Sequence, residues 1–243
     1  MSESDYIVEY LFDEKANTRY IFLKIPQTKS DGTKQIPRVY ASDGVNRGTK
    51  TAQEIASENG FKICINAGLF NPTINTYEPE GMIIENRVVL QNKPAVFYPD
   101  SKPLTIDSDG KLGYVDPSYD ANELVSDGIC CAVCGFMPIV INHEAVSSDK
   151  WTKVPHYTSK HQRQIIGQFE NGDYAIITGE GRGYADSDGW TIKEVQNICI
   201  KHELKFAYNL DGGTSTETVV DGKLLNSLYQ RHELRRAPTF IVF

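Results

Sequence analysis

The sequence lacks the two kinds of segment that would direct a chain into or across a membrane. It contains no run of about 18 or more apolar residues, so no membrane-spanning helix is expected. Its first ten residues, MSESDYIVEY, lack the basic and then apolar pattern of a secretory signal. Because the chain also begins with Met1, we expect it to stay in the cytoplasm, where it is made.

Positive charge is also scarce. The chain has 25 Lys and Arg residues against 32 Asp and Glu residues, which gives a net charge of −7. Proteins that bind nucleic acids neutralise phosphates with clustered Lys and Arg. A nucleic-acid polymer is therefore not expected as the main partner, and the sequence does not decide the oligomeric state.

Cysteines are few, and their number, five in 243 residues, is odd, so they do not predict a disulfide framework. Cys131 and Cys134 form a lone Cys-x-x-Cys pair, whereas a closed zinc site needs four ligands at recognisable spacing. We interpret these residues as small buried thiols and expect no metal or other cofactor. A divalent cation at the acidic loop 179–189 stays open, since oxygen ligands are present there without the spacing of an EF-hand.

The sequence does contain what a globular protein needs, including 40% apolar residues. Short apolar runs of strand type alternate with turn residues along most of the chain. The clearest pairs are 6–12 with 19–25, and 164–169 with 173–178, where Glu-Asn-Gly separates the two strands. These patterns predict hairpins and therefore antiparallel pairing.

Helices are fewer than strands. Residues 49–58 and 191–203 have helical apolar spacing, threonines at the start and, in the first case, Asn-Gly at the end. Strands that outnumber helices and are joined by hairpins predict an α+β fold, with a mixed, largely antiparallel sheet flanked by a few helices. We expect one domain over 1–243, with the N-terminal strands and first helix of 1–59 packed on it.

One stretch, residues 205–226, has the organisation of a site. An apolar strand is followed by Asp211, two glycines and three hydroxyl residues, and then by a hairpin with an Asp-Gly turn. Glycines permit positive φ and close approach of a ligand to the backbone. Successive backbone N–H groups of such a turn can bind an anion, with the hydroxyls of Thr214 and Ser215 beside the carboxylate. An ordinary turn is the alternative interpretation.

The heptapeptide NLDGGTS at 209–215 resembles the NLDGGGS signature of the phosphodiester glycosidase family, which includes the lysosomal "uncovering enzyme" and many bacterial and phage members. Further segments resemble the other blocks of this family in the family's order, over about residues 60–243. They are CINAGLF at 64–70, PEGMII at 79–84, CGFMPIV at 134–140, HQRQIIG at 161–167, GEGRGYADSDGWTI at 179–192 and RRAPTFIV at 235–242. As a set these blocks are specific.

The chain departs from the family's pattern at four positions. Thr214 replaces the third glycine of the signature, Cys134 replaces a serine, and Gln162 replaces the proline before Arg163. The aspartate of the family's Asp-Gly-Arg element is Glu180 here. The resemblance implies that the chemistry is kept while the substrate pocket differs. The family residues that are kept are Asn66, Arg163, Arg182 and Asp211.

The resemblance implies a hydrolase that cleaves a glycosyl 1-phosphodiester. Phosphate is already a good leaving group at an anomeric carbon, so groups that hold phosphate matter more than a strong general acid. We expect Asp211 to be the catalytic carboxylate and Arg163 to hold the phosphate, with Arg182 and Glu180 in support. The other expected substrate-binding residues are Asn66, Gly68, Glu80, Gly212, Gly213, Thr214 and Ser215.

Alternatives stay open at this point. Arg163 could pair with a structural carboxylate, Glu180 could lie on a solvated loop, and the flanking His156 and His161 are assigned no role. For the whole protein, the competing hypotheses are a carbohydrate- or nucleotide-binding module without turnover and a structural phage-tail component with a vestigial site. The expected partner is a small sugar phosphodiester or nucleotide-sugar-like molecule, and the sequence names neither its sugar nor its aglycone.

Overall fold

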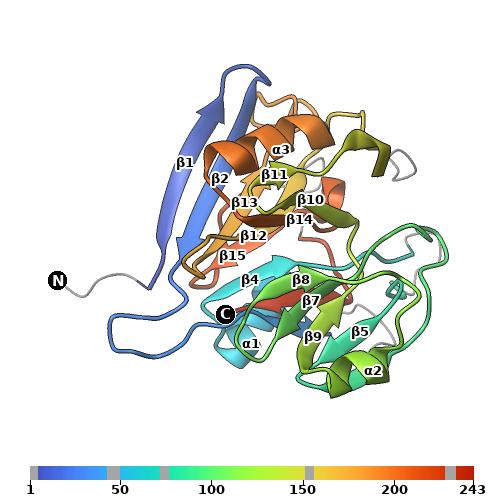
Figure 1. The fold of residues 1–243 in the computed structure, drawn as a ribbon. Helices are drawn as coiled ribbons and strands as arrows, with labels where there is room; N and C mark the ends of the chain where they lie inside the picture. Colours follow the sequence, from blue (N-terminus) through green and yellow to red (C-terminus); the bar gives the residue numbers. More distant parts are fainter. Residues whose placement is uncertain (1–4, 43–49, 72–76, 151–155, 228–233) are drawn as a thin grey trace.

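The computed structural model describes residues 5–42, 50–71, 77–150, 156–227 and 234–243. Its strands form one seven-stranded sheet and two five-stranded sheets (Figure 1). Every pairing between the described strands is antiparallel. Together with three α-helices, these sheets confirm the predicted α+β class and its largely antiparallel pairing.

The seven-stranded sheet contains both hairpins that the sequence predicts. The N-terminal hairpin pairs with the second hairpin through β2 (Thr18–Ile25) and β13 (Tyr174–Gly179), so the first strands of the chain extend the sheet that contains β14 (Phe206–Asn209). In order across the sheet, the strands are β1 (Ile7–Asp13), β2 (Thr18–Ile25), β13 (Tyr174–Gly179), β12 (Arg163–Gln168), β14 (Phe206–Asn209), β10 (Met137–Ile141) and β11 (Glu144–Ala145).

The two smaller sheets lie side by side under the large one (Figure 1). The first has the order β16 (Lys223–Leu224), β15 (Thr218–Val220), β4 (Ile63–Asn66), β17 (Thr239–Val242) and β3 (Arg38–Ala41). The second has the order β6 (Val88–Gln91), β5 (Ile83–Glu85), β9 (Ile129–Val133), β7 (Leu104–Asp107) and β8 (Leu112–Tyr114).

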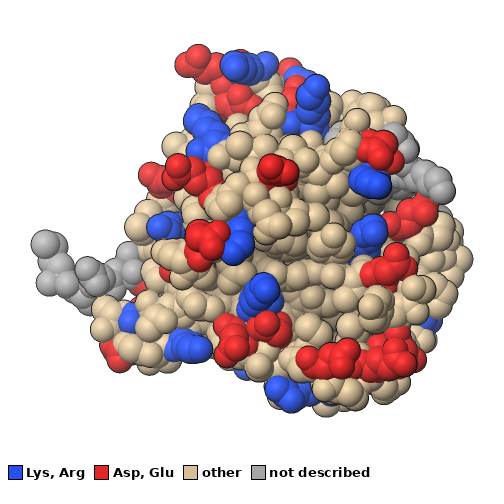
Figure 2. All heavy atoms as spheres, viewed as in Figure 1, with Lys and Arg blue, Asp and Glu red and all other residues tan. Residues whose placement is uncertain are grey.

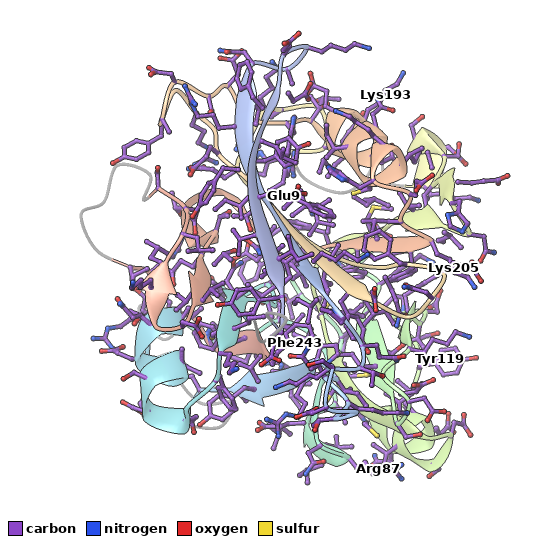
Figure 3. All side chains as sticks on the ribbon, turned by 90° about the vertical axis from the view of Figure 1, so that its left-hand side faces the viewer. Glu9, Arg87, Tyr119, Lys193, Lys205 and Phe243 are labelled. Carbon is purple, nitrogen blue, oxygen red and sulfur yellow. The ribbon has the colours of Figure 1, made fainter. Side chains whose placement is uncertain are left out.

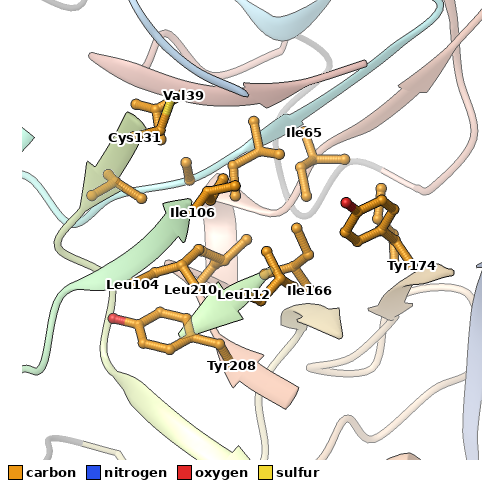
Figure 4. Packing of buried hydrophobic residues seen from close by; sticks show 14 of the residues in the cluster. Val39, Ile65, Leu104, Ile106, Leu112, Cys131, Ile166, Tyr174, Tyr208 and Leu210 are labelled. Atoms are coloured by element: carbon orange, nitrogen blue, oxygen red, sulfur yellow. The ribbon is translucent and has the colours of Figure 1, made fainter. Parts of the chain in front are cut away.

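The main apolar core lies where the three sheets meet. Ile166 and Tyr208 from the large sheet, Ile65 from the first small sheet and Leu104 from the second belong to one buried cluster (Figure 4). Each such side chain stabilises the fold by roughly 1.5–3 kcal/mol through burial. At its border, Phe243 packs edge-on against Tyr174, with ring centroids 5.5 Å apart, below the β1–β2 hairpin in Figure 3. The core therefore joins the N- and C-terminal parts of the chain.

Helices cover the outer faces of the sheets (Figure 1). The helix α3 (Ile192–Lys201) packs on the large sheet, whereas α1 (Ala52–Asn59) and α2 (Ala121–Ser126) pack on the two small ones. Thr51 and Thr191 cap α1 and α3 with a capping box, in which a glutamate three residues later bonds back to the cap. None of the described helices is long and apolar enough to cross a membrane.

The surface carries charges of both signs. On the face shown in Figure 2, Lys and Arg side chains are interspersed with Asp and Glu side chains over most of the surface, and acidic side chains gather in a strip at the lower right. Cys131 and Cys134 are buried, as predicted. Within the described part of the chain, no three His, Cys, Asp or Glu side chains converge into a group that could hold a metal ion.

Strand ends from two sheets meet at one edge. In the large sheet, the last residue of β14, Asn209, pairs with Ile165 near the start of β12. The first residue of β12, Arg163, pairs with Gly179 at the end of β13. In the first small sheet, β4 ends at Asn66 beside the start of β17. Most of the candidate site residues that the sequence indicated lie at these strand ends or in the segments that follow them.

Candidate active site

The turn that follows β14 packs closely against two neighbouring segments. The N–H of Asp211 donates to the carbonyl oxygen of Ala67 (3.0 Å), and the N–H of Gly213 donates to that of Gln162 (3.0 Å). A Cβ atom on Gly212 would lie 2.8 Å from the carbonyl oxygen of Gln162, so a side chain there would clash with the backbone. Gly213 has φ of +60°, which glycine adopts without strain. Both glycines are therefore needed for the turn.

The backbone of the turn is not a free anion-binding nest. The N–H of Ser215 donates to the carbonyl of Gly212, and the N–H of Thr216 donates to that of Gly213, which forms the 3₁₀ turn η3 (Gly213–Ser215). The N–H of Gly212 donates to the Asp211 carboxylate (2.9 Å). Because these donors already have partners, the expectation that the turn's N–H groups grip an anion does not fit the structure.

Asn66 connects the two ends of the turn. Its side-chain N–H₂ donates to the carbonyl of Asp211 (2.7 Å), and its side-chain oxygen accepts from the N–H of Glu217 (2.9 Å). The residue is 2% exposed. Asn66 therefore shapes the site by bracing the turn, and the expectation that it contacts the substrate does not fit these two bonds.

The carboxyl group of Asp211 lies in a partly buried, weakly hydrated environment. Burial raises its pKa from 3.8 to about 6, although the Ser215 hydroxyl, the charge of Arg235 and the N–H of Gly212 each favour the ionised form. A carboxylate with a pKa near neutrality is a stronger base than an exposed one and is still largely ionised at pH 7. The Ser215 hydroxyl, which was expected to contact the substrate, donates a hydrogen bond to the Asp211 carboxyl group in this structure.

Arg235 supplies the positive charge that favours the ionised form of Asp211. The sequence alone assigned no role to this arginine. Its Nη1 donates to the Thr214 hydroxyl, and its guanidinium carbon lies 4.9 Å from the centre of the Phe70 ring. The ring and the hydroxyl hold the guanidinium at the turn. Arg235 opens the last family-like segment of the sequence, which was the available signal, but its contact with Thr214 depends on the tertiary fold.

Glu217 is a second residue that the sequence analysis missed. It is 1% exposed, and burial raises the pKa of its carboxyl group to about 7. Its two oxygens accept from the N–H of Arg235 and, at 3.4 Å, from the N–H of Ala52 in α1. Glu217 thus connects the turn to the segment that carries Arg235.

Arg163 occupies a different place from the one expected. Its Nε donates to the carbonyl of Trp190 (2.9 Å), and its Nη2 donates to the carbonyls of His156 (2.8 Å) and Ser159 (3.0 Å). The residue is 4% exposed, and burial together with the charge of Arg182 lowers its pKa to about 10. Arg163 holds the segment before β12 in place, and its expected role as the phosphate clamp does not fit these bonds.

Arg182 and His161 form a pair at the other side of the turn. The Nε of Arg182 donates to Nδ1 of His161 (2.8 Å). A Cβ atom built on Gly213 would lie 3.3 Å from Nη2 of Arg182, so the guanidinium lies against the backbone of the turn. Arg182 therefore lies beside the turn, and its bond to His161 places that imidazole there as well.

Glu180 is buried and not on a solvated loop. The residue is 7% exposed, and burial raises its pKa. Its Oε1 accepts from the N–H of Ser227 (2.7 Å), while its Oε2 has no hydrogen-bond partner among the described residues. A buried carboxyl group with one unpaired oxygen is suited to meet a ligand.

Glu80 is a bracing residue. Its Oε2 accepts from the N–H groups of Val96 (2.5 Å) and Phe97 (3.2 Å), which fixes the segment that leads into Tyr98. Burial raises the pKa of Tyr98, and the charges of Asp211 and Glu80 add to this effect. Tyr98 therefore lies within electrostatic reach of Asp211, and no sequence motif marks it.

Gly68 is enclosed in the protein interior. Its N–H donates to the Thr239 hydroxyl (2.9 Å), and a Cβ atom on it would lie 2.7 Å from a methyl group of Val133. The expectation that Gly68 contacts the substrate does not fit this packing. The glycine is needed because the segment that follows β4 passes this close to its neighbours.

Comparison with known proteins places this chain in a family. A model of the family described as "Phosphodiester glycosidase" matches residues 59–243. The chain belongs to the phosphodiester glycosidase family. A curated relative, the SPbeta prophage-derived uncharacterized protein YomE of Bacillus subtilis, is 27% identical over 180 residues, which is 74% of this chain. The chain spans only 27% of the length of that relative.

Solved structures share the fold of this chain. The catalytic domain of zebrafish N-acetylglucosamine-1-phosphodiester α-N-acetylglucosaminidase, auto-inhibited by its pro-peptide, matches with a TM-score of 0.73 and 15% identity, over 99% of this chain and 82% of that one. A hypothetical protein from Synechocystis matches with a TM-score of 0.69 and 13% identity, over 98% of this chain and 61% of that one. At these identities the likeness concerns the fold alone.

Unpaired buried polar atoms gather around the Asp211 turn. Among the described residues, eight buried side-chain nitrogen or oxygen atoms have no hydrogen-bond partner, and seven of them belong to this region. Most buried polar atoms in native proteins have partners, so this concentration makes the turn a candidate site for a polar ligand or bound water. The seven are His161 Nε2, Gln162 Oε1, Glu180 Oε2, both amide atoms of Asn209, Thr216 Oγ1 and Arg235 Nε.

Proposed function

We propose that this phosphodiester glycosidase hydrolyses the bond between the anomeric carbon and a phosphate oxygen of a small sugar 1-phosphodiester. The observation that carries the proposal is the Asp211 carboxyl group, whose pKa is raised to about 6, set beside Arg235 in a turn surrounded by unpaired buried polar atoms. The family match supports the reaction class. Neither the geometry at Asp211 nor the family match identifies the sugar or the aglycone.

In the proposed reaction the carbon–oxygen bond to phosphate breaks, and its electron pair leaves with the phosphate monoester. Water supplies the new bond to the anomeric carbon and gives one proton to Asp211. The carboxylate also faces the positive charge that develops on the sugar ring. The carboxylate has the basicity that this step needs, because its burial makes it a better proton acceptor than an exposed aspartate.

We assign the phosphate to the two guanidinium groups that flank the turn. Arg235 lies on the Thr214 side and Arg182 on the Gly213 side, so a phosphate above the turn would meet one cation from each direction. Glu180, with its raised pKa and unpaired oxygen, supports the proposal as a residue that bonds the sugar or the departing phosphate. In this proposal Arg163 acts indirectly, by holding the backbone of the segment that includes His161.

The test is hydrolysis of a panel of sugar 1-phosphodiesters by wild type and by Asp211→Asn. Loss of the base should lower kcat by about 10²–10⁴-fold without unfolding the protein. The matched control is Asp186→Asn on an exposed loop position, which has φ of +54° that asparagine also adopts, and it should keep full activity.

Two further readouts complete the test. Binding of the diesters without any turnover by wild type would contradict hydrolysis and favour a binding module. Equal turnover by Asp211→Asn and wild type would contradict the role of the carboxylate. Dialysis against EDTA before the assay tests the expectation that no metal is required, and full activity after dialysis is the expected result.

A further inference from the structure

The side chain of His161 is held in a defined orientation at the turn. Its backbone N–H and carbonyl bond to the carbonyl and N–H of Trp190, at 3.1 and 3.0 Å. The Nε of Arg182 donates to its Nδ1 (2.8 Å). Since an arginine N–H is only a donor, Nδ1 must be the unprotonated ring nitrogen and the single proton lies on Nε2.

The surroundings keep this imidazole neutral. Burial lowers the pKa of His161 from 6.5 to about 4, and the charges of Arg182, Arg163 and His156 act in the same direction. The ring of His156 lies nearly perpendicular to it, with the ring centres 5.0 Å apart. At neutral pH the ring is therefore a hydrogen-bond donor that does not give up its proton.

This donor has no acceptor within the described part of the chain. Among the residues that the structure describes, no group accepts a hydrogen bond from Nε2 of His161, although the atom is buried. A buried donor that is left unpaired is costly, and native proteins keep such groups mainly where a ligand or water completes the bond. The Oε1 atom of the neighbouring Gln162 is also without a hydrogen-bond partner among the described residues, so two adjacent residues have unpaired side-chain atoms.

We infer that His161 and Arg182 together form a phosphate-oxygen subsite, in which the neutral imidazole donates its Nε2–H to an oxygen of the diester. The inference rests on the proposed hydrolysis for its place in the reaction, and on the Arg182–His161 bond and the unpaired nitrogen for its geometry. No proton is transferred. The imidazole stabilises the phosphate oxygen that gains negative charge as its bond to the anomeric carbon breaks and the phosphate departs.

The binding test uses the wild-type chain with ¹⁵N-labelled histidine and needs no turnover. His161 should appear as the Nε2–H tautomer and should not titrate between pH 5 and 8. Inorganic phosphate, and separately a sugar 1-phosphate, should shift its Nε2 resonance. His143, which is exposed and paired with Glu170, is the internal control and should not shift by a comparable amount. A resonance that titrates near 6.5, or that ignores both probes because water fills the position, would overturn the inference.

The kinetic test compares His161→Ala with His161→Gln. The alanine variant should lose about 10²–10³-fold in kcat, the effect of removing one oxyanion donor. The glutamine amide carries an N–H near the position of Nε2, so it should recover part of that loss. If the two variants lose activity equally and in step with their melting temperatures, His161 is only structural and the inference fails. Phosphate shifts in the wild-type spectrum without any hydrolysis would support the subsite while the proposed hydrolysis fails.

Discussion

Replacing Asn66 with alanine should destabilise the protein and disable the turn at the same time. The side chain closes a bridge between the carbonyl of Asp211 and the N–H of Glu217, through bonds of 2.7 and 2.9 Å. Alanine removes both bonds and leaves both backbone groups without their partner. The site is 2% exposed, so water replaces the amide poorly.

The magnitude follows from these two bonds. Each hydrogen bond contributes about 1 kcal/mol net, and each buried group left unpaired costs about 1–3 kcal/mol. For two such groups, the free energy of unfolding should therefore fall by about 2–6 kcal/mol. In a chain of this size, 1 kcal/mol shifts the melting temperature by about 2–4 °C, so a decrease of about 4–24 °C is expected. Because the turn carries Asp211, kcat should also fall.

Urea unfolding, followed by circular dichroism, measures the change. The midpoint should move to lower urea while the slope stays that of wild type, since the surface exposed on unfolding is unchanged. Asn197→Ala, an exposed position on α3, is the control and should change the free energy of unfolding by less than about 0.5 kcal/mol. If Asn66→Ala unfolds at the wild-type midpoint, the bracing role assigned to Asn66 is wrong.

Three more predictions concern titration and the arginine of β12. If Asp211 acts as the ionised base with a pKa of about 6, kcat/KM should fall about tenfold per pH unit below pH 6. A pH–rate profile in which kcat/KM begins to fall only near pH 4 would contradict this. The carboxyl of Glu217 has a pKa of about 7 when folded, above its unfolded value near 4.5, so the folded state holds a proton that the unfolded state releases between these values. Stability should therefore decrease by roughly 3 kcal/mol as pH rises from about 4.5 to 7, and Glu217→Gln should flatten that dependence in urea unfolding measured at each pH. Arg163→Lys should lower both the melting temperature and kcat, because an ammonium group cannot reach all three carbonyls, whereas an unchanged melting temperature with only a raised KM would instead indicate a phosphate clamp.

The departures from the family's pattern have separate structural consequences. Thr214, in place of the third glycine, supplies the hydroxyl that accepts from Arg235. Cys134, in place of serine, is buried beneath Gly81, where a Cβ atom would lie 2.6 Å from the Cβ of the cysteine. Gln162, in place of proline, leaves an unpaired side-chain oxygen beside His161. Two of the substitutions therefore alter the polar groups of the candidate site, whereas Cys134 belongs to the interior.

Local sequence patterns were enough to predict most of the elements. The Asp221–Gly222 turn adopts positive φ at both residues (+46° and +74°), as the hairpin signal requires. The predicted helices were confirmed with Thr51 and Thr191 as their caps, because a capping box involves residues only three positions apart. The turn after β14 was also visible as a cluster of one carboxylate, glycines and hydroxyls.

By itself, the sequence determined the antiparallel α+β class, the hairpins and the position of the Asp211 turn, since these depend on neighbours along the chain. The tertiary structure alone decided which side chains serve the site. Asn66 bonds a carbonyl 145 residues away, and Arg163 and Arg235 have opposite roles because one guanidinium faces backbone carbonyls and the other faces the turn. Such roles depend on partners that only folding brings within hydrogen-bond distance, and on burial, which raises the pKa of Asp211 and lowers that of His161.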